Sequence, residues 1–128
     1  MKALIVCNGE APPRQLLKGA ASESDLIIGA DGGGETLLEA GIRPNIVLGD
    51  MDSFDEAEHP ELDILSLDDQ ETNDLEKALD YALEQGAVSA VIMGAFGKRV
   101  DHGLKNLSVL YAYSEQFESV CFRDVYQD

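Results

Sequence analysis

The chain has 128 residues, about one domain's length, and its 45% hydrophobic content is enough to fill a single core. Its 25 acidic residues against 9 Lys and Arg give a formal net charge of −16. This charge disfavours nucleic acid as a partner, because phosphate backbones are bound by clustered cations. No apolar run approaches the length of a membrane helix, and the one near the N-terminus is too short for a signal peptide.

Neither a repeat nor a linker divides the chain, so residues 1–128 are expected to form one domain. Its two cysteines, Cys7 and Cys121, lie in apolar runs, where buried thiols are expected rather than a disulfide. The sequence therefore predicts a cytoplasmic protein that binds neither nucleic acid nor membranes.

Short apolar runs alternate with helical patterns along the whole chain. Strands are expected at 2–7, 25–30, 45–50, 62–67, 87–95 and 119–124, and helices at 13–21, 35–41, 73–86 and 101–115. The helix at 73–86 is the best defined, because Leu75, Leu79 and Leu83 repeat at helical spacing. This alternation predicts an α/β fold with a mostly parallel sheet of about six strands and helices on both faces, a Rossmann-like three-layer arrangement.

Glycines and polar residues follow four of the predicted strands. They stand at 8–9, 31–34, 49–52 and 94–101. In open α/β sheets, ligands bind beyond the carboxyl ends of the strands, so these loops predict a site at one edge of the sheet. Each loop alone is also explained as a turn, since Gly and Asp favour turns. Carboxylates in three of the four loops favour the site.

The segment GDMDS places Asp50 and Asp52 two residues apart, directly after a predicted strand. In extended chain such side chains point the same way, so both can face one metal ion while Met51 turns back toward the core. Gly49 would leave room for a ligand, and paired carboxylates suit Mg²⁺. The alternative is an aspartate turn in which Ser53 caps a short helix.

Three glycines, 32–34, precede a predicted helix, and their N–H groups can cradle phosphate or form a flexible turn. Asn73 and Glu76 fit a capping box, which by itself explains an acid at Asp74 in the first helical turn. By the same local argument Lys77 is a solvated lysine.

Lys98 and Arg99 are adjacent cations in a chain poor in cations, which favours a phosphate-binding role. The alternative is that Asp101 caps a helix while both cations face solvent. His102 is expected to be a structural, hydrogen-bonded histidine, and His59 a surface residue.

Four stretches together resemble one enzyme family. They are ADGGG at 30–34, PNIVLGDMDS at 44–53, TNDLEKAL at 72–79 and GKRVDHGLKNL at 97–107. In this order they resemble thiamine pyrophosphokinase, which transfers diphosphate from ATP to thiamine. The resemblance implies that Asp50, Asp52 and Asp74 bind Mg²⁺, so that Asp74 is a metal ligand rather than only a helix residue.

The resemblance also implies a nucleotide- and phosphate-binding set: Asp31, Gly32, Gly33, Gln70, Lys77, Lys98, Arg99 and Asn106. Asp101 is expected in the catalytic set with the three metal ligands, either accepting the hydroxyl proton or orienting Arg99. Two positions depart from the family. Asn73 stands where many members have Thr or Ser, and Lys98 where a second glycine is common.

The resemblance implies that residues 1–128 are the family's catalytic nucleotide-binding domain. The resemblance implies that a second, all-β domain, which contributes to the thiamine site and to a homodimer, is absent from this chain, so activity of the chain alone is not implied. Two other functions stay open. One is a related diphosphokinase acting on a pterin-type alcohol, and the other is a non-catalytic Mg–nucleotide-binding domain.

Overall fold

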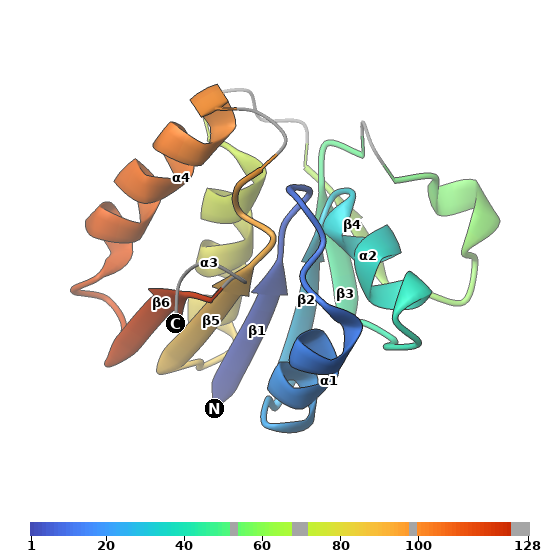
Figure 1. Cartoon of the computed structure of the whole chain (residues 1–128), viewed down its shortest axis with the longest axis horizontal. Helices are drawn as coiled ribbons and strands as arrows, with labels where there is room; N and C mark the ends of the chain where they lie inside the picture. The colour runs from blue at the N-terminus through green and yellow to red at the C-terminus, as the bar shows by residue number, and fades with distance from the viewer. Residues whose placement is uncertain (52–53, 68–71, 98–99, 124–128) are drawn as a thin grey trace.

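Six strands form one sheet with helices on both of its faces (Figure 1). The structure is a computed structural model, and it describes residues 1–51, 54–67, 72–97 and 100–123, without the side chains of 100–102. Every strand pair in the sheet is parallel, which confirms the predicted fold class.

The elements follow the predicted order. They are β1 (Lys2–Val6), α1 (Arg14–Ser22), β2 (Leu26–Ala30), α2 (Gly33–Glu39), β3 (Ile46–Gly49), the short 3₁₀ helix η1 (Glu56–Glu58), β4 (Ile64–Ser66), α3 (Asp74–Glu84), β5 (Ser89–Met93), α4 (Val100–Tyr113) and β6 (Ser119–Phe122). Most bounds lie within two residues of the prediction. α2 begins two residues earlier than expected, inside the glycine run.

The strands stand in the order β4-β3-β2-β1-β5-β6. The chain therefore builds outward from β1 to β4 and then returns to the other side of β1, which places the topological switch point between β1 and β5. The loops that follow β1 and β5 run side by side there. The N–H of Gly9 donates to the Gly94 carbonyl (2.6 Å), and the N–H of Glu10 donates to the Phe96 carbonyl (2.7 Å). Ligands of doubly wound sheets bind at this edge.

Two apolar cores lie on opposite faces of the sheet. α3 and α4 cover one face, where Leu79 and Val109 share a cluster with Ile5 of β1. α1 and α2 cover the other, where Leu17 and Leu37 pack in a second cluster with the neighbouring β1 residues. Consecutive residues of β1 thus contribute to different cores, as expected for a parallel strand that is buried on both faces. The predicted three layers are confirmed.

A third, smaller cluster holds the connection between β3 and β4. Val47, Phe54 and Leu62 form it, and Met51 packs against it. Elsewhere, neither cysteine forms a disulfide, as expected, but only Cys7 is buried while Cys121 is half-buried, so the expectation of burial is wrong for Cys121. Among the described residues no helix combines the length and apolar character needed to cross a membrane.

Candidate functional site

Three aspartates from three separate segments meet at the carboxyl edge of the sheet. Asp31 follows β2, Asp50 follows β3, and Asp74 begins α3. Each offers one carboxylate oxygen, and these three oxygens lie within 4.8 Å of one another. Asp31 is only 4% exposed, while the other two are half-buried. The structure thus brings Asp50 and Asp74 together, as the metal-site prediction requires, and adds Asp31, which the resemblance placed with the nucleotide. We call these three residues the aspartate cluster.

The backbone at Asp31 turns the chain directly from β2 into α2. Its φ is 48°, a left-handed conformation that aspartate tolerates better than most residues. Its N–H donates to the Leu48 carbonyl of β3 (2.8 Å), and its own carbonyl accepts from the N–H of Gly34 (3.0 Å). This turn therefore keeps Asp31 attached to β3, the strand that leads to Asp50.

The glycines after Asp31 are packing residues. A side chain on Gly33 would overlap the carbonyl oxygen of Val6, and one on Gly34 would lie 2.8 Å from Val47 Cγ2. Gly32 is in close contact with the side chain of Asn8 in the same way. These contacts let α2 approach β1 and β3 closely. Phosphate binding at Gly32 and Gly33 stays a prediction.

The GDMDS segment departs from the extended chain that the sequence suggested. β3 ends at Gly49, and Met51 has a φ of 64°, so the expectation of extended backbone is wrong at Met51. The Met51 side chain nevertheless packs on the small cluster, as predicted. Asp52 lies outside the described residues. The space at Gly49 is taken by a protein group, since a Cβ there would lie 2.9 Å from Asp74 Oδ1.

The first turn of α3 carries the predicted capping box. The N–H of Glu76 donates to Asn73 Oδ1 (2.9 Å), and the N–H of Asn73 donates to Glu76 Oε1 (3.3 Å). Asp74 stands next to the cap, where the helix dipole favours an acid. The structural and the functional interpretation of Asp74 are therefore compatible.

Lys77 is buried, with 7% of its side chain exposed, so the local expectation of a solvated lysine is wrong. Its Nζ donates to the Leu67 carbonyl (3.0 Å) and lies 3.7 Å from Asp74 Oδ1. When ionised, the three acids and this lysine carry a net charge of −2. Two unit charges 4 Å apart interact by about 4 kcal/mol at an effective dielectric constant of about 20. This repulsion and the hard oxygen donors together suit a divalent cation.

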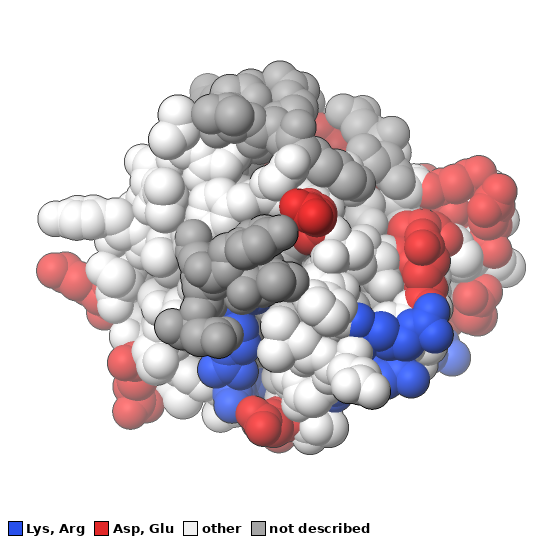
Figure 2. Space-filling model, viewed as in Figure 1, with Lys and Arg blue, Asp and Glu red and all other residues white. Residues whose placement is uncertain are grey.

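Figure 2 shows where the charged side chains lie on one face of the molecule. On the face shown, Lys and Arg side chains lie in the lower half, toward the amino ends of the strands in Figure 1. Acidic side chains gather along the right-hand side of that view. On this face, therefore, the visible basic side chains are not gathered at the carboxyl edge.

Asn106 of α4 is 8% exposed, and its amide is bonded on both sides. Nδ2 donates to the Ala95 carbonyl (2.8 Å), and Oδ1 accepts from Asn73 Nδ2 (3.1 Å). The remaining predicted site residues lie outside what the structure describes. They are Gln70, Lys98 and Arg99, and the side chain of Asp101.

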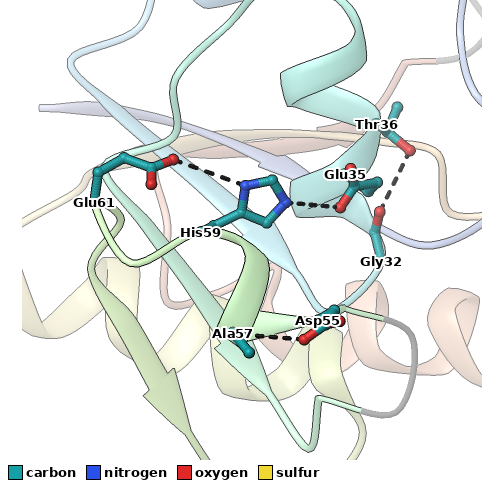
Figure 3. A network of polar contacts seen from close by, with 7 residues as sticks. All are labelled: Gly32, Glu35, Thr36, Asp55, Ala57, His59 and Glu61. Carbon is teal, nitrogen blue, oxygen red and sulfur yellow. Dashed lines mark hydrogen bonds and ion pairs between the residues drawn. The ribbon is translucent and has the colours of Figure 1, made fainter.

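His59 is not the surface residue that the sequence suggested, since its side chain is only 18% exposed. Its ring stacks on Phe54 with centroids 5.1 Å apart. Figure 3 shows it between two carboxylates, with Nε2 3.3 Å from Glu35 Oε2 and Nδ1 3.7 Å from Glu61 Oε1. His59 thus ties the loop after β3 to the first turn of α2, a contact between residues too far apart in sequence to be predicted locally.

The chain matches a family model described as "Thiamin pyrophosphokinase, catalytic domain" over residues 17–122. It is 41% identical over 102 residues to thiamine pyrophosphokinase of Bacillus subtilis, covering 74% of this chain and 47% of that protein. It is 30% identical over 88 residues to thiamine pyrophosphokinase 1 of Oryza sativa, covering 56% and 32%. This chain therefore spans less than half the length of either curated relative.

Solved structures give the same result. The crystal structure of thiamin pyrophosphokinase from Geobacillus thermodenitrificans superposes with a TM-score of 0.78 at 31% identity, over 97% of this chain and 60% of that one. The Bacillus subtilis enzyme gives 0.79 at 31% identity, over 98% and 61%. With a family match over most of its length, this chain belongs to the thiamin pyrophosphokinase catalytic-domain family.

Proposed function

We propose that this chain is the nucleotide-binding, catalytic part of a Mg²⁺-dependent thiamine diphosphokinase, which converts ATP and thiamine to AMP and thiamine diphosphate. The observation that carries the proposal is the aspartate cluster, which lies at the carboxyl edge of a parallel sheet in a chain of this family. Carboxylates from three different segments converge there, which a simple turn does not explain.

The donor chemistry of the cluster fits the metal. Mg²⁺ prefers hard oxygen ligands and is usually held by one or two carboxylates together with substrate phosphates. Asp50 and Asp74 would hold it, with Asp52 as the further ligand that the resemblance assigns and Asp31 beside them. Bound Mg²⁺ would supply positive charge that stabilises the transferring phosphates.

The protein's own part in the transfer is positioning and charge. The thiamine hydroxyl oxygen forms a bond to the β-phosphorus of ATP, the bond from that phosphorus to the α-phosphate oxygen breaks, and AMP leaves. We assign Lys77, Lys98 and Arg99 to the phosphates. Asp101 accepts the hydroxyl proton or orients Arg99. Asp31, Gly32, Gly33 and Gln70 complete the nucleotide side of the site.

Several wider features belong to the same proposal. The family relationship supports small-molecule substrates, and the acidic charge of −16 argues against nucleic acid. We propose that residues 1–128 act with the family's all-β thiamine-binding domain, as a homodimer in the cytoplasm.

The direct test is product formation by the complete gene product that carries this chain. With ATP, Mg²⁺ and thiamine, phosphorus NMR should show AMP and thiamine diphosphate forming together, and chelation of the metal should stop both. AMP formed with a pterin-type alcohol but not with thiamine would select the related diphosphokinase. Nucleotide binding without AMP from either alcohol would select the non-catalytic domain.

A further inference from the structure

We propose that Asn73 and Asn106 form an amide bridge that positions Asp74 for metal binding, so that Asn106 is a positioning residue and not a direct nucleotide ligand. The inference rests on the proposed metal site. It concerns how the protein holds one ligand of that site, and it is carried by contacts among described residues.

The bridge is a directed series of three hydrogen bonds. The N–H of Glu76 donates to Asn73 Oδ1, Asn73 Nδ2 donates to Asn106 Oδ1 (3.1 Å), and Asn106 Nδ2 donates to the Ala95 carbonyl (2.8 Å). A backbone donor fixes one end and a backbone acceptor fixes the other. The orientation of both amides is therefore determined, because turning either one would face donor to donor or acceptor to acceptor.

The bridge joins three segments around the site. Asn73 is the N-cap of α3, Ala95 lies in the loop after β5, and Asn106 lies in α4. Asn106 and Ala95 are both buried, at 8% and 3% exposure. A buried amide bonded at both ends is costly to disturb, because breaking either bond leaves a buried polar group without a partner. The position of the α3 N-terminus relative to β5 is therefore strongly fixed.

The bridge fixes the position of Asp74, because Asp74 is the residue directly after Asn73. Its carboxylate lies in a confined place, against Gly49 on one side and 3.7 Å from Lys77 Nζ on another. A small rotation of the first turn of α3 would move this carboxylate out of the 4.8 Å group that it forms with Asp31 and Asp50. Side chains that orient metal ligands in this way commonly contribute about 10- to 100-fold to metal affinity.

A second contact between the same helices provides a matched control. Tyr113 donates its hydroxyl proton to Asp80 Oδ1 (2.7 Å), which links α4 to α3 at a point six residues beyond Asp74. Six helical residues span about 9 Å. Breaking this contact should loosen the packing of the two helices without rotating the first turn of α3.

The test compares metal affinity with stability in four variants. Asn73→Ser keeps a side-chain oxygen suited to the N-cap but lacks the amide donor. The other three variants are Asn106→Ala, the double variant that combines both changes, and the control Tyr113→Phe. Binding of Mn²⁺ alone is measured by electron paramagnetic resonance at a temperature where all the proteins are folded. Metal-free thermal melts report stability separately.

We expect each bridge variant to weaken Mn²⁺ binding by about tenfold or more. The double variant should bind Mn²⁺ no more weakly than the more affected single variant does, because the two residues act as one unit. Tyr113→Phe should melt earlier yet bind Mn²⁺ as the parent does. Bridge variants that keep the parent's affinity, or whose losses multiply in the double variant, would overturn the positioning role. A parent protein that binds no Mn²⁺ would instead overturn the metal site itself, and the bridge's role with it.

Discussion

Gly49 is a residue at which both the backbone conformation and the proposed metal site require glycine. Its φ of 133° favours glycine, and a Cβ there would lie 2.9 Å from Asp74 Oδ1. The end of an aspartate side chain can move away from such a contact, whereas backbone cannot. Filling the space beside Asp74 is therefore expected to weaken metal binding more than it destabilises the fold.

Gly49→Ala should lower the free energy of unfolding by about 1–3 kcal/mol through backbone strain and should also weaken Mg²⁺ binding by displacing the Asp74 carboxylate. Gly41→Ala is the matched control, since Gly41 also has a positive φ, 79°, but nothing lies within 4 Å of its Cβ position. Urea unfolding and metal titration of both variants separate the two effects. Equal metal affinities for both variants would show that Gly49 makes no room for Asp74.

For single residues, the sequence predicted the chemical role more reliably than it predicted burial and contacts. Asp50 was predicted as a metal ligand from its position after a strand and Asp74 only from the family resemblance, and the two lie together. The burial of Lys77 and the two carboxylates around His59 were missed. Lys77 donates to a carbonyl ten residues away, and His59 meets Glu35 across 24 residues, so local patterns hold no trace of either contact.

Among the elements, α2 depends on glycine because it packs so closely on the sheet. We expect Gly33→Ala to lower the free energy of unfolding by at least about 2 kcal/mol, because the new methyl group would overlap the Val6 carbonyl. Gly19→Ala in α1 should instead stabilise the protein by about 0.5–1 kcal/mol, since nothing lies within 4 Å of that position. Chemical denaturation measures both. A Gly33→Ala protein as stable as the parent would contradict the close packing of α2.

The contact between α3 and α4 at Tyr113 is expected to depend on pH. Burial, and then the hydrogen bond to Asp80, raise the pKa of Tyr113 above its ordinary value of 10.0. The folded state therefore favours the neutral phenol, and the resulting stability is complete below that ordinary value and is lost as the pH rises above it.

Tyr113→Phe should cost about 0.5–1.5 kcal/mol near pH 8, and the gap between parent and variant should narrow as the pH is raised above about 10. Urea unfolding of both proteins across this range is the measurement. The other tyrosines are common to both proteins, so their titration cancels in the comparison. A gap that stays constant at high pH would contradict the hydrogen-bonded, neutral state of Tyr113.

The order and type of the elements were predictable, because short apolar runs alternate with amphipathic helices and glycine stops. Several boundaries were not, and two of them have a reason in the packing. α2 starts at Gly33, although glycine is a poor helix former, because only glycine fits against β1 there. β4 is shorter than its apolar run, because Leu62 leaves the strand pattern to pack with Val47 and Phe54.

For the whole molecule, strand order determines which loops become neighbours. The sequence predicted that four loops share one edge of the sheet, but not which of them touch. β2 lies beside β3, which brings Asp31 to Asp50, and the crossover to β5 brings the fourth loop to the first. Strand order depends on how the complete core packs, so the membership of Asp31 in the cluster could not be read from spacing.

The acidic balance of the molecule makes the metal central to any nucleotide site. A chain with a net charge of −16 would repel a polyphosphate, and the aspartate cluster would repel it most strongly at close range. Divalent metal and nucleotide are therefore expected to bind far better together than either does alone.

The most direct test is a thermal melt of the chain with and without Mg²⁺ and a nonhydrolysable ATP analogue. Ligand at about a hundredfold excess over its Kd stabilises the folded state by about 2.7 kcal/mol, which should raise the melting temperature of the parent by several degrees. Asp31→Asn, Asp50→Asn and Asp74→Asn should remain folded and lose most of that rise, while Gly41→Ala should melt earlier but keep it. A parent that shows no shift at millimolar ligand, or a full shift in all three aspartate variants, would contradict the assignment of the cluster as the metal–nucleotide site.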